Sequence, residues 1–271
     1  MDQIPNYGKG TGLTFAAMKI ALLGYGNMGQ LIEKMATAEG DEVVLIVDET
    51  NRASVTTADL TAADVVIDFT RPEAAVANIE LALAAGVPVV VGTTGWLNEL
   101  PRVRQRVATS GGALFWASNF SIGVNVFFAT AARAAELVDR YGGYAPAVEE
   151  IHHEGKRDAP SGTAITLAER VAEQLAAYDS WRLGEVATAV PQTHIAPASA
   201  PAAGKEPVTI NSVREPGVPG THVLTFRSEI DTLEVRHTAH SRAGFARGAL
   251  VAARWLVGKR GTFTMTDLLG I

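Results

Sequence analysis

The sequence predicts an α/β protein in which a doubly wound parallel sheet is joined to a smaller α+β domain. Three observations predict this fold class. From Met18 to about Arg140, short apolar runs alternate with helical stretches, as in parallel βαβ units. Past Tyr144, strand-like segments follow one another with one helix among them, which favours an α+β arrangement. At 271 residues and 47% hydrophobic content, the chain can bury the cores of two domains.

A glycine-rich turn follows the first strand. Met18 to Leu23 is typical of a short buried strand, and a helical stretch runs to about Glu39. Between them the sequence reads Gly24-Tyr25-Gly26-Asn27-Met28-Gly29. The glycines of a Gly-x-Gly-x-x-Gly turn permit a tight bend, the approach of a pyrophosphate and close helix packing. The glycines alone would also fit a structural turn, but strand, turn and helix in this order predict a Rossmann dinucleotide site.

The second strand, Val43 to Val47, bears on the choice of cofactor. It ends at Asp48, whose carboxylate can accept hydrogen bonds from a ribose diol. Glu49 doubles the negative charge, which disfavours a 2′-phosphate, although Arg52 is near enough in sequence to supply a compensating guanidinium. We therefore expect NADH as the cofactor, with NADPH also accepted.

Further strands continue the alternation. They are expected at Val65 to Thr70, Val87 to Val91 and Ala113 to Ala117, with helices from Pro72 to near Gly86 and from about Val124 to Arg140. Ligands bind beyond the carboxyl ends of strands in a doubly wound sheet. The turn Gly92-Thr93-Thr94-Gly95 is in such a position, and we favour a place beside the nicotinamide over an ordinary βα turn.

The stretch from Glu150 to Thr163 concentrates groups that can bind an anion and transfer a proton. His152 and His153 have side chains that titrate near neutrality, and Lys156 adds an ammonium group. An apolar stripe predicts a helix from about Thr163 to Tyr178, with Ser161 near its start. Its first amides, with Gly162 allowing close approach, would form a pocket for phosphate or carboxylate.

Three other interpretations of this stretch are less favoured. It could be a solvated loop with a helix cap, although the coincidence of so many groups opposes that. A zinc site is disfavoured because adjacent histidines point apart, no His-x-x-x-His pair appears and the chain has no cysteine. Ser161 lacks the Gly-x-Ser-x-Gly elbow of a nucleophile. No metal is expected.

After Tyr144, strands are expected at Pro146 to His152, Val208 to Arg214, His222 to Ile230 and Thr232 to His240. Gly184 to Pro207, rich in Ala and Pro, is expected to be a long loop between helix and strand. A terminal helix should run from about Ala246 to Val257.

Together these segments resemble the dihydrodipicolinate reductase family. The most specific part is His152-His153 with Lys156 and Asp158-Ala-Pro-Ser-Gly-Thr163, supported by the glycine-rich turn, Gly92 to Gly95 and Ala117-Ser-Asn-Phe120. The resemblance implies a Rossmann domain over residues 18–121, a mixed-sheet substrate and oligomerisation domain over 122–238, and a segment 239–271 that returns to the first domain. It does not cover residues 1–17, which are expected to be a leader or an extension.

The resemblance also implies roles for individual residues. His152 would be the acid/base residue and Lys156 a proton donor, while His153, Ser161, Gly162 and Thr163 would bind a dicarboxylate substrate. The expected cofactor residues are Gly24, Tyr25, Gly26, Asn27, Met28, Gly29, Asp48, Gly92, Thr93, Thr94, Ala117, Ser118, Asn119 and Phe120. The family forms homotetramers and uses NAD(P)H to reduce dihydrodipicolinate in lysine and diaminopimelate biosynthesis. In two places the chain departs from the usual family sequence, at Pro216 and Thr221, close to Arg214.

Composition limits the remaining classes. A net charge of -6 argues against nonspecific nucleic-acid binding. No apolar run is long enough for a transmembrane helix, and the first residues do not form a signal peptide, so neither membrane insertion nor export is expected. The lack of cysteine fits the cytoplasm. Two rival functions remain: another Rossmann dehydrogenase of a small amino or oxo acid, such as aspartate or homoserine, and a sensor that binds dinucleotide without turnover.

Overall fold

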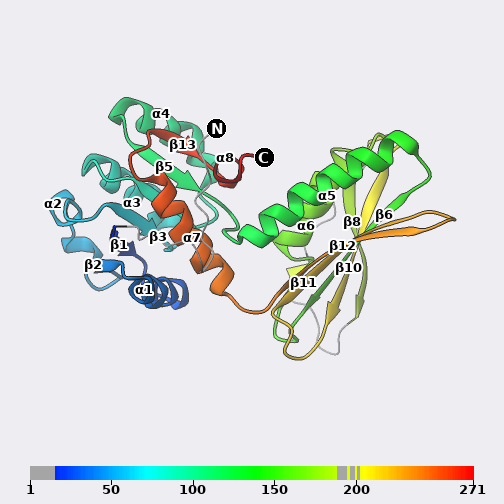
Figure 1. Ribbon diagram of the computed structural model, residues 1–271, viewed down its shortest axis with the longest axis horizontal. Helices are drawn as coiled ribbons and strands as arrows, with labels where there is room; N and C mark the ends of the chain where they lie inside the picture. The colour runs from blue at the N-terminus through cyan, green and yellow to red at the C-terminus, as the bar shows by residue number, and fades with distance from the viewer. Residues whose placement is uncertain (1–15, 188–193, 196–198, 200–201) are drawn as a thin grey trace. The chain divides into compact units, whose positions relative to one another are not determined.

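The computed structural model describes residues 16–187, 194–195, 199 and 202–271. The described residues divide into two compact units (Figure 1): those from 16 to 122 with 243–271, and those between 123 and 242. None of the helices in the described ranges is long and apolar enough to cross a membrane.

The first unit contains a parallel six-stranded sheet. Its strands, in spatial order, are β13 (Gly261–Phe263), β5 (Ala113–Trp116), β4 (Val89–Val91), β3 (Val65–Asp68), β1 (Lys19–Leu23) and β2 (Glu42–Val47). The chain leaves β1 toward β2 on one side and resumes with β3 on the other. The sheet therefore has a topological switch point between β1 and β3, which is where doubly wound folds bind ligands.

Helices cover both faces of this sheet. Alternate residues of β1 belong to different cores, because Ile20 and Leu22 face one side while Ala21 and Leu23 face the other. The first core packs against α1 (Asn27–Glu39), α7 (Ala243–Leu256) and α8 (Met265–Leu269). The second packs against α2 (Thr57–Leu60), α3 (Pro72–Ala84) and α4 (Leu100–Ser110). Short 3₁₀ turns lie at Arg52–Ser54 (η1) and Leu97–Glu99 (η2). The predicted doubly wound fold is confirmed.

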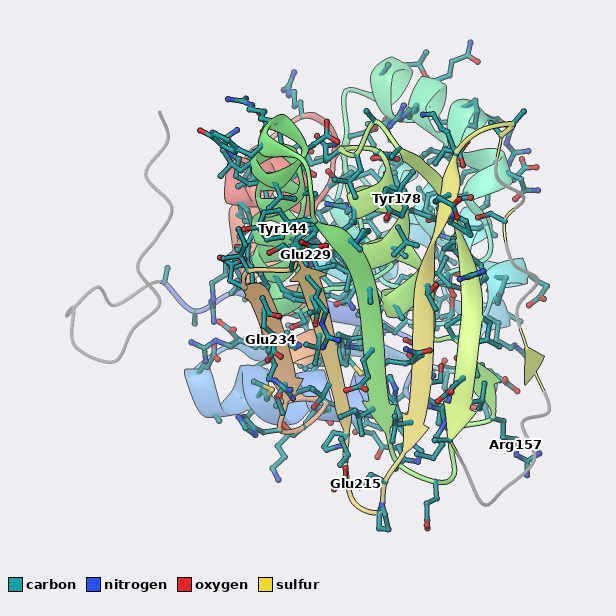
Figure 2. The ribbon with its side chains drawn as sticks, turned by 90° about the vertical axis from the view of Figure 1, so that its right-hand side faces the viewer. Tyr144, Arg157, Tyr178, Glu215, Glu229 and Glu234 are labelled. Atoms are coloured by element: carbon teal, nitrogen blue, oxygen red, sulfur yellow. The ribbon has the colours of Figure 1, made fainter. Side chains whose placement is uncertain are left out.

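The second unit is built on a mixed five-stranded sheet. Its spatial order is β12 (Thr232–Ala239), β11 (Gly220–Arg227), β6 (Ala145–His152), β10 (Glu206–Arg214) and β8 (Tyr178–Ala187). Helices α5 (Ile122–Tyr141) and α6 (Gly162–Ala172) share one apolar core with the sheet. Strands β7 (Asp158–Ala159) and β9 (His194–Ile195) pair in parallel and form a separate two-stranded sheet. Figure 2 views this unit from its sheet side, with Glu215 in the turn between β10 and β11.

Two predicted elements of the second unit are wrong in extent. The helix after Ser161 ends at Ala172, although Leu175 continues the apolar stripe. Leu175 is still buried in the same core, because the chain turns back there and the Tyr178 amide donates to the Leu175 carbonyl. The apolar stripe in the sequence therefore extends beyond the last residue of the helix.

The expected loop from Gly184 to Pro207 is also wrong at both ends. Strand β8 runs through Ala187, and β10 begins at Glu206. The two strands pair in parallel, so their backbone N–H and C=O groups find hydrogen-bond partners on a strand that is distant in sequence. A local sequence pattern cannot predict such pairing. Part of the expected loop, residues 188–193, 196–198 and 200–201, lies outside the described residues.

Candidate functional site

The glycine-rich turn lies at the switch point of the first sheet. Gly24 follows β1, and α1 begins at Asn27 with Gly26 as its N-cap. No acidic residue stands in the first turn of α1, so no side chain of that turn competes with an anion for its free amides. The turn therefore offers an amide-lined, uncompensated helix N-terminus.

The three glycines of the turn differ in the space around them. A Cβ at Gly24, where φ is +92°, would lie 2.1 Å from the Phe69 carbonyl oxygen, and one at Gly29 would lie 2.2 Å from the Gly24 carbonyl oxygen. Both glycines permit close packing. At Gly26 a Cβ would meet nothing within 4 Å. The open side of the turn is thus at the middle glycine, where a pyrophosphate would need the backbone to be bare.

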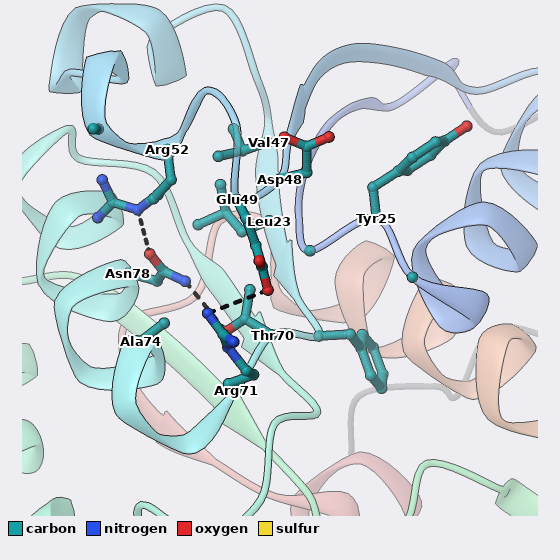
Figure 3. A pocket seen from close by; sticks show the side chains of 14 residues that line it. Leu23, Tyr25, Val47, Asp48, Glu49, Arg52, Thr70, Arg71, Ala74 and Asn78 are labelled. Atoms are coloured by element: carbon teal, nitrogen blue, oxygen red, sulfur yellow. Dashed lines mark hydrogen bonds and ion pairs between the residues drawn. The ribbon is translucent and has the colours of Figure 1, made fainter.

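A cavity of about 660 Å³ opens beside the turn (Figure 3). Asp48 lines it, and this carboxylate accepts hydrogen bonds from the Thr50 amide (2.8 Å) and hydroxyl (2.6 Å). These bonds lower the pKa of Asp48, so the side chain is an anion at neutral pH. Both bonds use Oδ1, and within the described residues Oδ2 has no protein donor. Asp48 is therefore suited to accept hydrogen bonds from a ribose.

The rim of this cavity carries cations as well as acids. Glu49 and Arg71 form an exposed ion pair at 3.2 Å, and Arg52 lies on the wall. The sequence drew attention to Asp48, Glu49 and Arg52 but not to Arg71. Two acids and two guanidinium groups thus line the same cavity.

The loop after β4 is tied to a buried acid. Asp68, at the end of β3, is fully buried and accepts a hydrogen bond from the Thr93 hydroxyl at 2.5 Å. Burial raises the pKa of Asp68, while bonds from Thr93, Asn78 and Thr70 oppose that rise. The Thr93 side chain is therefore engaged inside the protein, and Thr93 can meet a cofactor only through its backbone.

The other predicted cofactor residues differ in exposure. Thr94 and Ser118 are exposed, whereas Ala117 and Phe120 are buried. Phe120 packs against Phe69 with tilted rings, 5.7 Å between centroids, and Asn119 accepts a hydrogen bond from the Ser121 amide. Gly92 follows β4, and a Cβ there would clash with the Phe69 ring at 2.1 Å. The structure brings these loops to the carboxyl edge of one sheet, as expected for parallel strands.

In the second unit, the histidine motif lies at the end of β6, close to the start of α6. Ser161 caps α6 through a hydrogen bond from the Ala164 amide at 3.2 Å. The amides of Gly162 and Thr163 are in the first helical turn and have no acceptor within the helix. Gly162 is exposed, and a Cβ there would meet nothing within 4 Å. An anion could therefore approach these two amides.

Glu150 organises the interior of this site. It is fully buried and accepts hydrogen bonds from the Ser212 hydroxyl (2.8 Å) and the Ser161 amide (3.0 Å). Arg214, also buried, places Nη1 3.6 Å from Glu150 Oε1. The register explains the meeting, since Ser212 and His222 are both paired across the sheet with Glu150. One helix amide at Ser161 is thus already occupied by a protein carboxylate.

Two imidazoles surround the same carboxylate. His152 Nδ1 lies 3.5 Å and His222 Nε2 3.8 Å from Glu150 Oε2, and the two rings meet edge to face at 5.1 Å. Burial lowers the pKa of His152 to about 4, against the opposing attraction of Glu150. Burial also lowers the pKa of His222 to about 3. Both rings are therefore neutral at neutral pH in the unliganded protein.

Lys156 and His153 are more accessible. The Lys156 ammonium contacts both carboxylate oxygens of Asp158, at 2.7 and 2.8 Å. His153 is exposed, and its carbonyl accepts from the Lys156 amide in a tight turn. The buried His152 and the exposed His153 therefore face different surroundings, although they are adjacent in sequence.

Glu150, His152 and His222 offer donor atoms within 4.8 Å of one another, a spacing that would admit a metal ion. Their existing contacts favour another explanation. The Ser161 hydroxyl pairs with His222 Nε2 at 3.1 Å, and the guanidinium of Arg214 already lies beside the carboxylate. A second cation there would be repelled, so the cluster is best described as a buried carboxylate held by Ser212, Ser161 and Arg214, with two neutral imidazoles beside it.

Several residues of both sites escaped the sequence analysis: Asp68, Asn78, Ser212 and His222 were not singled out, and Glu150 and Arg214 were noted without a role. Only cross-strand register brings the second-unit residues to the motif. A buried charged residue inside a strand pattern, such as Glu150 or Asp68, was the one signal that could have found them.

Comparisons with known proteins give the family. The family model described as "Dihydrodipicolinate reductase, N-terminus" matches residues 18–120, and the one described as "Dihydrodipicolinate reductase, C-terminus" matches residues 123–269. A 4-hydroxy-tetrahydrodipicolinate reductase of Christiangramia forsetii is 42% identical over 254 residues, which cover 93% of this chain and 98% of the relative. One from Ralstonia nicotianae is 38% identical, covering 78% of this chain and 76% of the relative.

Solved structures agree on the fold. A dipicolinate-bound dihydrodipicolinate reductase from Paenisporosarcina sp. TG-14 superposes with a TM-score of 0.72 at 24% identity, covering 92% of this chain and 98% of that one. An amine dehydrogenase from Mycobacterium smegmatis superposes with a TM-score of 0.56 at 11% identity, covering 93% and 96%. With family models over both units and relatives at this identity, the chain belongs to the dihydrodipicolinate reductase family, NAD(P)H-dependent oxidoreductases of lysine biosynthesis.

Proposed function

We propose that the chain reduces dihydrodipicolinate, formed from 4-hydroxy-tetrahydrodipicolinate, to tetrahydrodipicolinate, with NADH as the preferred cofactor and NADPH also accepted. The observation that carries the proposal is that Glu150 contacts both His152 and the amide of Ser161, the residue just before the free amides of Gly162 and Thr163, while the charge of Lys156 is near enough to act on His152. That site suits a dianionic substrate that must receive a proton.

Substrate binding is assigned to the start of α6 and the residues before it. The amides of Gly162 and Thr163 would hold one carboxylate, and the exposed His153 and the Lys156 ammonium would attract the other. Ser161 contributes through position, because its hydroxyl caps α6 and its amide is bound to Glu150. Such preorganised donors stabilise charge without having to reorganise.

Proton transfer is assigned to Lys156 and His152. In the unliganded site, His152 is neutral because its pKa is lowered to about 4. A bound dicarboxylate would raise that pKa, since nearby negative charge favours the imidazolium. His152 would then gain a proton as the substrate binds, and Lys156 would supply the other cationic donor near the ring. The dihydronicotinamide supplies the hydride when it is bound.

Cofactor binding is assigned to the first unit, at Gly24 to Gly29, Asp48, Gly92 to Thr94 and Ala117 to Phe120. The middle glycine supports this assignment, because a Cβ at Gly26 would project into open space where a pyrophosphate would lie. The ionised Asp48 disfavours a second negative group at the ribose, which supports NADH over NADPH. The cations at the rim leave NADPH acceptable.

The test is nicotinamide oxidation by the purified protein with dihydrodipicolinate generated by a coupled synthase. NADH and NADPH are compared in parallel, and omission of the synthase gives the background. Turnover with a higher kcat/KM for NADH is expected. Tight NADH binding without turnover would instead favour another dehydrogenase of a small amino or oxo acid, or a sensor.

We also propose a cytoplasmic homotetramer. In the second unit, α5 and α6 pack on one face of the sheet, and residues of β6 that point the other way, such as Ala147 and Ile151, are only partly buried. None of that unit's described helices lies in front of this face in Figure 2. Sedimentation equilibrium would give the mass of the assembly, and cell fractionation its location.

A further inference from the structure

The wall of the cavity in the first unit contains a chain of hydrogen bonds that no cofactor role explains. Arg52 Nε donates to Asn78 Oδ1 at 2.7 Å (Figure 3), and Asn78 Nδ2 donates to Asp68 Oδ2 at 2.6 Å. Asn78 is 1% exposed and Asp68 fully buried. A surface guanidinium is thus connected through a buried amide to a buried acid.

The orientation of the Asn78 amide follows from its partners. A guanidinium N–H can only donate, so the amide oxygen must face Arg52. The amide nitrogen then faces Asp68 Oδ2 and the Thr70 hydroxyl, at 2.6 and 3.3 Å. Asp68 is itself held by Thr93 and Thr70. Each member has one arrangement that satisfies its neighbours, so Asn78 is a rigid anchor for Arg52.

The anchor engages only one part of the guanidinium. Arg52 Nε is bonded, while within the described residues neither Nη1 nor Nη2 makes a hydrogen bond or ion pair. Arg52 lines the same cavity as Asp48 and Glu49. Arg71, the other cation there, is already paired with Glu49 and is largely exposed. Arg52 is therefore the held cation with spare donors at the ribose end of the cavity.

We propose that Asn78 is a specificity-determining positioning residue, which holds Arg52 so that its free amino groups can receive a 2′-phosphate. This inference rests on the proposed function, because it explains how NADPH remains acceptable beside Asp48 and Glu49. An arginine that is held in place loses less rotamer freedom on binding an anion than one that is free. NADH carries no 2′-phosphate and gains nothing from the anchor.

The variants Asn78→Leu, Arg52→Ala, Arg52→Lys and the Asn78→Leu/Arg52→Ala double variant test this, with Arg106→Ala as a control that removes an exposed cation outside the cavity. Calorimetry measures the binding of 2′,5′-ADP and of ADP to the full chain, and kcat/KM is measured with NADPH and NADH. Asn78→Leu is expected to weaken the binding of 2′,5′-ADP by about two- to tenfold and the binding of ADP by less than about twofold. The kcat/KM for NADPH should fall with it.

The double variant decides whether Asn78 acts through Arg52. In the Arg52→Ala background, the Asn78 substitution is expected to have no further effect on 2′,5′-ADP. An equal loss for ADP, or an undiminished effect without Arg52, would overturn the proposal. If Asn78→Leu does not fold, the Arg52→Lys variant provides the test. If that variant binds 2′,5′-ADP in preference to ADP as strongly as the wild type does, the anchored geometry of the guanidinium is irrelevant and the proposal fails.

Failure of the proposed function gives a different result. A wild-type chain that binds 2′,5′-ADP through Asn78 and Arg52 but does not reduce dihydrodipicolinate would leave the anchor intact and remove the reductase assignment. A chain that reduces dihydrodipicolinate but whose kcat/KM for NADPH is unaffected by Asn78→Leu would keep the reductase assignment and remove the anchor.

Discussion

Replacement of Glu150 by glutamine tests whether a buried charge network supports the second unit. The substitution keeps the shape and one acceptor, but it removes the negative charge beside Arg214, 3.6 Å away. Both side chains are fully buried, so the guanidinium would lose the carboxylate charge beside it and keep the carbonyls of Lys156, Asp158 and Val213. Breaking a buried ion pair from one side costs about 3–5 kcal/mol. Because glutamine still accepts one hydrogen bond, we expect the lower end, about 3 kcal/mol.

Urea unfolding followed by circular dichroism measures this loss. Glu149→Gln is the matched control, because Glu149 is the preceding residue of β6 and is exposed. The control should change the free energy of unfolding by less than about 0.5 kcal/mol. Loss of Glu150 also removes the attraction that raises the pKa of His152, so that pKa should fall further. If the Glu150→Gln protein is as stable as the Glu149→Gln protein, the charge of Glu150 beside Arg214 does not stabilise the second unit.

The other predictions concern stability in acid, the proton site and the glycine turn. The pKa of His222 is lowered to about 3 and that of His152 to about 4. Above about pH 6.5 both histidines are neutral in the folded and the unfolded chain, and the fold has its full stability. As the pH drops from 6.5 toward 4, the unfolded chain binds protons that the folded chain does not, so the free energy of unfolding falls. The slope is up to about 1.4 kcal/mol per pH unit for each such proton. Urea midpoints across this range should show a shallower slope for His222→Gln. His152→Gln should lower kcat by at least about a hundredfold while NADH binding, measured by fluorescence, is unchanged, whereas Gly162→Val should mainly raise KM for the substrate. Gly24→Ala should destabilise the first unit by about 2 kcal/mol or more, because φ is +92° and the Phe69 carbonyl oxygen would lie 2.1 Å from the new Cβ. Gly26→Val should change the free energy of unfolding by less than about 1 kcal/mol and should weaken NADH binding.

Each of these has an outcome that contradicts it. A stability profile flat between pH 6.5 and 4 would mean that the two imidazoles are not held neutral. Equal loss of cofactor binding in His152→Gln and Gly162→Val would contradict the division into two sites. A Gly26→Val protein that binds NADH normally would place the pyrophosphate elsewhere.

Much of this protein could be read from its sequence because the relevant features are contiguous. The glycine-rich turn is a local strand–turn–helix unit, although Gly24 is also packed against the distant Phe69 carbonyl. The motif from Glu150 to Thr163 also lies within one short segment, from the end of β6 to the first turn of α6. Local periodicity sufficed for β1 to β5 and for α1, α3 and α5. Where it failed, as at Ala172 and Ala187, pairing or packing with distant residues overrode the local pattern.

The surroundings of those motifs depend on the tertiary fold. Glu150 meets Ser212 and His222 because three strands pair in a particular register, and a shift by one residue would turn these side chains to the other face. The lowered pKa of His152 follows from burial, which depends on that packing. In the first unit, the anchoring of Arg52 joins η1, α3 and β3, which are separated in the chain. The sequence determined which groups are present, and the fold determined their neighbours, their charge and their freedom to move.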